Sequence, residues 1–156
     1  MRASLRAERE NGALYATMDI TNRILARSNN YIVLHEYEVA LLERPIGPRV
    51  VIGDFYGDPT AAVIDWKEKW CVIAGRGLIL YWLREPFENY EYNKETDQWW
   101  EVHRSPPEEW WIEALYQIDD NIVRFVVDPY GNFSGLYELR IDSLSIARLI
   151  PNEGSV

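Results

Sequence analysis

Residues 49–86 read RVVIGDFYGDPTAAVIDWKEKWCVIAGRGLILYWLREP, and this stretch carries the clearest structural pattern in the chain. Its four apolar runs lie at 50–52, 61–64, 70–73 and 78–83. Val, Ile, Trp and Tyr fill these runs, whereas Gly, Asp and Pro fill the gaps, which is typical of short strands joined by tight turns. Gly75-Arg76-Gly77 separates the last two runs and predicts a hairpin between them.

The same alternation of apolar runs and turn residues continues on both sides of this stretch. We predict further strands at 13–20, 23–27, 31–43, 110–118, 122–127, 136–141 and 144–150. The run 31–43 is long, and its β-branched and aromatic residues favour one strand over a helix. We therefore expect a mainly β protein with little helix, in which an antiparallel meander forms a sandwich, a curved sheet or an open barrel.

The segments 61–83 and 112–140 share the same order of strands and turns. This echo is consistent with a duplicated hairpin unit or blade-like sheet, and equally with any meander of short strands. A chain of 156 residues is too short for a complete propeller, whose blades need about 40 residues each. We predict a single domain over 1–156, with frayed tails at 1–10 and 151–156.

The charge balance limits the classes of partner. The chain holds 25 acidic and 16 basic residues, which gives a formal net charge of −9. Binding to nucleic acid or to an anionic membrane requires a basic surface, so we predict neither. The N-terminal MRASLRAERENG lacks the apolar core of a signal peptide, which predicts a cytoplasmic protein.

No residue pattern indicates catalysis, a metal or a cofactor. Cys71 lies in an apolar run and is predicted to be a buried structural thiol. His35 and His103 lack metal-ligand spacing, so we expect neither to bind a metal. Asp54 and Asp58 in GDFYGDP are predicted to cap backbone N–H groups of a turn, because the further ligands of a calcium loop are absent. We therefore predict that the protein is not an enzyme.

The segment 85–109 differs from the rest of the chain because it is acidic and aromatic at once. It holds eight acidic residues and two basic residues, and it carries one Trp pair and ends just before another. No clear hydrophobic period runs through it, so we predict a long loop or a protruding hairpin. Loops of this length in compact domains are often functional. Trp and Tyr form hot spots at interfaces, and acids attract a basic partner. The predicted partner-binding residues are Glu88, Tyr90, Glu91, Tyr92, Asp97, Trp99, Trp100 and Glu101.

A small, acidic, β-rich protein with such loops resembles the immunity proteins of bacteria, and the central GDFYGDPTAAVID and KWCVIAGRGLILYWL segments resemble small bacterial proteins of that kind. The resemblance implies stoichiometric inhibition of a cognate, basic toxin domain from a system of interbacterial antagonism. It matches no defined family motif and assigns no residue roles.

Three other functions remain open from the sequence. A carbohydrate or small-ligand binding module would use exposed Trp and Tyr rings. A small hydrolase would use a pair of carboxylates flanking a cleft. A scaffold subunit would form a homodimer through its aromatic patch, and the sequence does not choose between monomer and homodimer.

Overall fold

The computed structural model describes residues 23–128 and 131–151, which form twelve antiparallel strands and no helix. Sheet 1 contains β1 (Ile24–Arg27), β2 (Ile32–Glu36), β3 (Val39–Glu43) and β4 (Val50–Asp54). Sheet 2 contains β5 (Ala61–Ile64), β6 (Trp70–Gly75), β7 (Gly77–Trp82) and β8 (Trp99–Val102). Sheet 3 contains β9 (Ile112–Asp119), β10 (Ile122–Val127), β11 (Gly135–Arg140) and β12 (Ser145–Pro151). The predicted antiparallel, mainly β class is confirmed.

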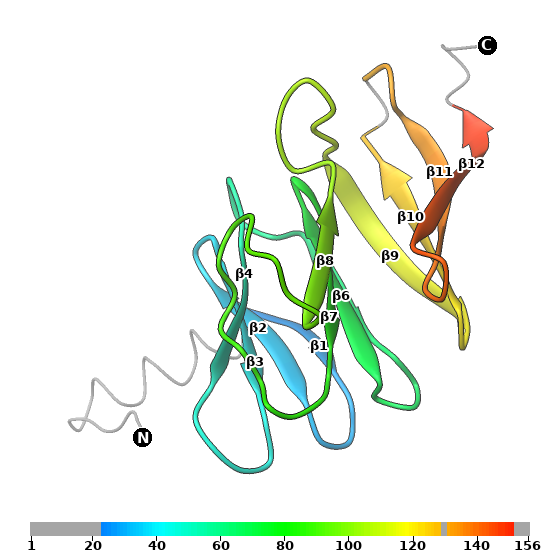
Figure 1. Cartoon of the computed structure of the whole chain (residues 1–156). Helices are drawn as coiled ribbons and strands as arrows, with labels where there is room; N and C mark the ends of the chain where they lie inside the picture. The colour runs from blue at the N-terminus through cyan, green and yellow to red at the C-terminus, as the bar shows by residue number, and fades with distance from the viewer. Residues whose placement is uncertain (1–22, 129–130, 152–156) are drawn as a thin grey trace.

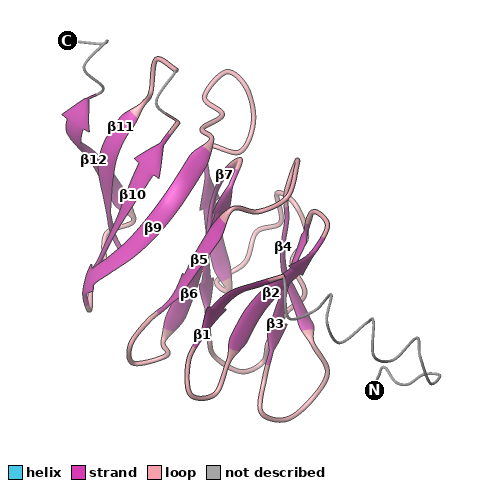
Figure 2. Ribbon diagram, turned by 180° about the vertical axis from the view of Figure 1, so that it is seen from behind, coloured by secondary structure: helices cyan, strands magenta, loops and turns pink. Residues whose placement is uncertain are grey.

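The three sheets follow one another along the chain and stack face to face, with sheet 2 in the middle (Figure 1). Within each sheet, neighbouring strands are also neighbours in sequence. The first strands of the sheets meet, because β5 contacts both β1 and β9. Figure 2 shows the sheets fanning out from this edge without closing into a barrel. Four-stranded meanders arranged in this way resemble consecutive blades of a propeller.

Two hydrophobic cores hold the stack together, one on each face of sheet 2. The first lies between sheets 1 and 2 and includes Ile52 and Ile73, and the second lies between sheets 2 and 3 and includes Val72 and Phe125. All six residues of β6 are buried, because alternate side chains enter opposite cores. A continuous apolar run is therefore what a strand covered on both faces requires. Cys71 is fully buried in the first core, as predicted, and burial raises the pKa of its thiol.

The strand predicted at 31–43 is wrong, because the chain turns back in the middle of it. β2 and β3 pair with Glu36 opposite Val39, so Tyr37 and Glu38 form a two-residue hairpin turn. Tyr37 has φ +55°, the left-handed conformation that such turns require. Gly, Asn or Asp usually occupies this position, so the sequence carried no signal for the turn.

The strands predicted at 61–64 and 122–127 are confirmed as β5 and β10. The segments 61–83 and 112–140, which looked alike in sequence, contain β5–β7 and β9–β11, the first three strands of sheets 2 and 3. The strand expected at 13–20 and the tails at 1–10 and 152–156 lie outside the described residues. Pro151 is not part of a frayed tail, because it ends β12 and pairs with Gly135. Within the described ranges, no helix is long and apolar enough to span a membrane.

Candidate functional site

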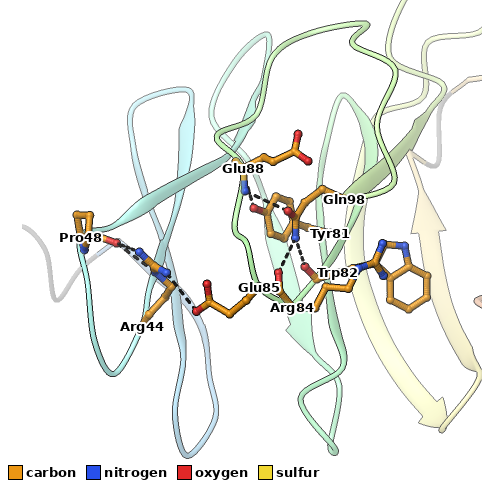
Figure 3. A network of polar contacts seen from close by, with 8 residues as sticks. All are labelled: Arg44, Pro48, Tyr81, Trp82, Arg84, Glu85, Glu88 and Gln98. Carbon is orange, nitrogen blue, oxygen red and sulfur yellow. Dashed lines mark hydrogen bonds and ion pairs between the residues drawn. The ribbon is translucent and has the colours of Figure 1, made fainter.

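The segment between β7 and β8 packs against the sheets and does not protrude. Gln98 organises it: its Nε2 donates to the carbonyls of Trp82 (2.7 Å) and Arg84 (3.1 Å), and its Oε1 accepts from the Glu88 N–H (3.0 Å). The Tyr81 hydroxyl donates to the Glu88 carbonyl at 2.6 Å. In Figure 3 the carboxylate of Glu88 points away from this network. The buried Gln98 amide therefore fixes the two ends of the segment to each other.

The same segment also covers the free edge of β4. The Val51 N–H donates to Asn89 Oδ1 at 3.0 Å, and the Tyr90 N–H donates to the Val51 carbonyl at 2.7 Å. At its other end, Arg44 forms an ion pair with Glu85 at 3.8 Å (Figure 3). Covering an edge strand with a loop satisfies backbone groups that would otherwise attract another strand. The residues between β7 and β8 therefore form a long loop, one of the two predicted alternatives, and this loop is anchored to the sheets.

Three of the eight predicted partner-binding residues make mainly internal contacts: Tyr90 and Trp99 are buried, and Glu101 is half-buried. Tyr90 and Trp99 are 7% and 5% exposed and belong to the first core. Glu101 accepts from the Tyr90 hydroxyl (2.5 Å) and from Arg104 Nε (2.9 Å). Burial, followed by the hydrogen bond to Glu101, raises the pKa of Tyr90. These side chains hold the segment in place through internal contacts.

The other five predicted residues lie at or near the surface. Glu91, Tyr92 and Asp97 are exposed, whereas Trp100 is half-buried against the second core. The half-buried Glu88 forms an ion pair with Lys94 at 3.4 Å. A shallow depression of about 440 Å³ at the outer edge of sheet 2 brings four predicted residues together with 93–96. Those four are Asp97, Trp99, Trp100 and Glu101.

Replacing Glu101 by alanine is expected to lower the free energy of unfolding by about 3 kcal/mol, because it leaves the charged Arg104 without its carboxylate partner and Arg104 Nε and the Tyr90 hydroxyl without their acceptor. The Glu101 and Arg104 side chains are 17% and 8% exposed, so water replaces the lost partner poorly. Glu91→Ala is the matched control and should change stability by less than about 0.5 kcal/mol. Urea unfolding followed by tryptophan fluorescence measures both; equal effects would contradict the internal role of Glu101.

A second surface, which the sequence did not reveal, lies where the β2–β3 hairpin meets the β4–β5 connection. An open hollow of about 740 Å³ has an apolar floor of Val39 and Leu41. Four carboxylates and one aromatic ring complete its lining: Glu36, Glu38, Asp54, Asp58 and Tyr37. We call this the acidic hollow. It combines residues 36–41 with residues 54–58, so only the pairing of β3 with β4 brings it together.

Backbone contacts tie the two sides of the acidic hollow together. Glu38 Oε2 accepts from the Gly57 N–H at 2.9 Å, and the Glu38 carbonyl accepts from the Phe55 N–H at 2.9 Å. The predicted turn in GDFYGDP is present, and Gly57 has φ +88°. The prediction that Asp54 and Asp58 cap it is wrong: Glu38, which lies nineteen residues away, supplies the cap.

The charges of the acidic hollow are only partly balanced. Glu36 lies 3.9 Å from Arg23. Asp54 and Asp58 have no ion-pair partner within the described residues. Tyr37 is 77% exposed and the neighbouring Tyr56 is 72% exposed. The hollow therefore presents bare carboxylates next to large aromatic surfaces, which favours contact with a cationic group.

Tyr56 connects the acidic hollow to the next loops at the same end of the sheets. The Arg76 guanidinium lies 5.0 Å from the Tyr56 ring centre and 5.8 Å from that of Trp111. It also forms an ion pair with Glu109 at 3.1 Å. These contacts hold Tyr56 at the rim, so its ring is available as a preformed contact surface.

The described residues offer no cluster of three or more His, Cys, Asp and Glu that could hold a metal ion. His103 stacks on Trp110 with ring centres 3.7 Å apart, and burial lowers the pKa of its imidazole. The Nδ1 of His35 lies 2.8 Å from the Tyr37 carbonyl. Both histidines therefore make local structural contacts.

No protein family, curated protein or solved structure matches this chain.

Proposed function

We propose that this protein is a non-catalytic binding protein that neutralises a basic protein partner, of the kind that an interbacterial toxin domain presents. The observation that carries the proposal is the acidic hollow, whose lining combines the exposed Tyr37 with the carboxylates of Asp54 and Asp58, which have no ion-pair partner among the described residues. The exposed Tyr56 lies between these two aspartates in the sequence. Lys or Arg side chains of the partner would enter the hollow and neutralise these carboxylates.

The shape of the acidic hollow favours a protein over a small molecule. Sites for small ligands enclose most of the ligand surface, whereas this hollow is shallow and open. Exposed tyrosines supply large contact areas that lose little conformational entropy on binding. The net charge of −9 would speed the encounter with a basic partner at low salt.

The acidic hollow adjoins the surface predicted from the sequence. Arg104 Nη2 donates to the Asp54 carbonyl at 2.6 Å and to the Tyr90 hydroxyl at 3.1 Å, so it joins the rim of the hollow to the segment that carries Glu91 and Tyr92. A partner covering the hollow would reach these exposed residues as well. The proposed contact surface therefore includes the exposed members of the predicted set.

Charge reversal tests the proposal. The full chain is used to capture its partner from the producing cell, and binding of the purified partner is then measured by calorimetry at two salt concentrations. We expect Asp54→Lys with Asp58→Lys to weaken binding at least about tenfold, more at low salt. Glu91→Lys with Asp97→Lys should weaken it less, because these residues lie outside the hollow.

A double variant of equal charge change provides the control. Asp119→Lys with Asp142→Lys alters exposed acids at the far end of sheet 3 and should leave affinity within about twofold. If all three double variants lost the same amount of affinity for the partner, net charge and not the acidic hollow would control binding. Retention of no polypeptide partner at either salt concentration would contradict the proposed function.

No observation favours the carbohydrate alternative. All seven Trp residues lie in the described ranges, and Trp66, at 64% exposed, is the one that lies mainly in solvent. The rings that would line a sugar groove, Trp99 and Trp100, pack against the two cores instead.

A further inference from the structure

The outer face of sheet 3, which points away from sheet 2, has no layer packed on it within the described residues. The strand register sets two rows of side chains across this face. The first row is apolar and consists of Ala114, Val126, Leu136 and Ile150. The second row consists of Tyr116, Arg124, Glu138 and Ala147. We call this surface the sheet 3 face.

The apolar content of the sheet 3 face is high for a surface in contact with water. Of the eleven exposed large hydrophobic residues, Tyr116 and Ile150 belong to this face. Ile118, Leu144 and Leu149 lie elsewhere in sheet 3 and its β11–β12 turn. Val126 and Leu136 are half-buried at its centre. Sheet 2 has similar apolar residues on both faces, and a neighbouring sheet covers each of them. A contiguous apolar patch of this kind marks an interaction surface.

The charges at the centre of the sheet 3 face differ from those of the chain as a whole. Glu138 lies between two arginines, with Arg124 Nε at 3.1 Å and Arg140 Nη2 at 3.8 Å. The arginine side chains are 42% and 53% exposed, whereas that of Glu138 is 12% exposed. The centre is therefore weakly positive in a chain of net charge −9. Two copies can approach through this face with little of the repulsion that acts elsewhere.

We propose that the sheet 3 face binds the same face of a second copy, with a two-fold axis parallel to the strands and between β10 and β11. This axis lays β10 of one copy over β11 of the other, and β9 over β12. The apolar row then packs on itself, with Val126 over Leu136 and Ala114 over Ile150 of the second copy. Sheets that pack face to face with nearly aligned strands form this type of contact.

The polar row fits the same axis. Arg124 of each copy lies over Glu138 of the other, so two pairs of opposite charge form across the interface. A two-fold axis running across the strands at the level of Tyr116 and Glu138 would instead lay β9 on an inverted β9. It would place Leu136 over Arg140. The register of sheet 3 therefore selects the axis parallel to the strands.

The size of the sheet 3 face predicts a dimer that dissociates on dilution. Four strands about 4.8 Å apart and about six residues long cover about 400 Å² per copy. A stable interface buries about 800 Å² per partner, so this contact lies below that size. We expect a dissociation constant in the micromolar range.

A charge-swap experiment tests the dimer independently of the fold. Full-length wild type should sediment at twice its 18.3 kDa mass at high concentration and as a monomer when diluted. Arg124→Glu alone and Glu138→Arg alone should each be monomeric, because like charges would face each other across the interface. An equimolar mixture should dimerise again, because every contact between positions 124 and 138 then joins an acid to a base. Within each variant chain, positions 124 and 138 still carry like charges. A return to the dimer mass can therefore come only from the contact between the two chains.

Ala147→Arg supplies a second variant that leaves the ion pair untouched, since the exposed Ala147 faces Tyr116 of the second copy. It should be monomeric with an unchanged circular dichroism spectrum. A wild type that stays monomeric at every concentration would overturn the proposal, as would a mixture of charge variants that fails to dimerise. The acidic hollow lies on sheet 1, so these variants should bind the basic partner as wild type does, and the two proposals can fail separately.

Discussion

Gly77→Ala is expected to lower the free energy of unfolding by about 3 kcal/mol or more, although it adds a single methyl group. Gly77 begins β7 with φ +84°, a conformation that side chains rarely adopt. A Cβ atom there would lie 2.6 Å from the Val102 carbonyl oxygen and 2.7 Å from that of His103. Both obstacles are backbone atoms, so a rotamer change cannot relieve the clash. Thermal unfolding monitored by circular dichroism measures the loss.

Gly131→Ala is the matched control. A Cβ atom at Gly131 would have its nearest neighbour at 4.0 Å, which is ordinary van der Waals contact. We expect a change of less than about 0.5 kcal/mol there. Similar stability of the two variants would mean that β7 does not approach the Val102 and His103 carbonyls this closely. The Gly77 N–H also donates to the Trp110 carbonyl at 2.7 Å, so the strain would act where sheet 2 meets sheet 3.

Phe125→Ala is expected to cost about 4 kcal/mol of stability, because it opens a cavity in the second core. Phe125 is fully buried, and its ring centre lies 5.4 Å from that of Tyr137 and 6.3 Å from that of Trp110. Removing it deprives both rings of a packing partner. Phe125→Leu keeps most of the volume and should cost about 1.5 kcal/mol. Urea unfolding by tryptophan fluorescence measures the series.

Ile46→Ala tests whether burial causes this effect. Ile46 is 86% exposed in the β3–β4 connection, so its truncation should change stability by less than about 0.5 kcal/mol. A Phe125→Ala variant as stable as Ile46→Ala would contradict the packing of sheet 3 on sheet 2. Because the second core is what joins these sheets, its loss should also weaken dimerisation through the sheet 3 face.

The strands could be predicted from the sequence because local patterns create them. The apolar runs at 61–64, 70–73 and 122–127 are strands, and the buried position of Cys71 follows from its place in such a run. The Gly75-Arg76-Gly77 turn is also local, since its glycines permit the tight reversal. The hairpin at Tyr37 could not be predicted, because its turn depends on the pairing of β2 with β3 and not on a turn-forming residue.

The exposure of individual side chains depended on partners far away in the chain. Tyr90, Trp99 and Glu101 looked like surface residues because acids surround them in sequence, yet Arg104 and the first core enclose them. The acidic hollow could not be predicted from the sequence for the same reason, because its lining comes from two segments that are separate in the chain.

The sequence by itself determined the class of fold, the position of most strands and the acidic character of the surface. These properties depend on residues within one strand or turn, or on composition alone. Only the tertiary structure decided which aromatic and acidic side chains meet on the surface, because strand pairing and sheet stacking bring distant residues together. The shared hollow of Tyr37 and Asp58, and the contact of Arg124 with Glu138, are products of that pairing.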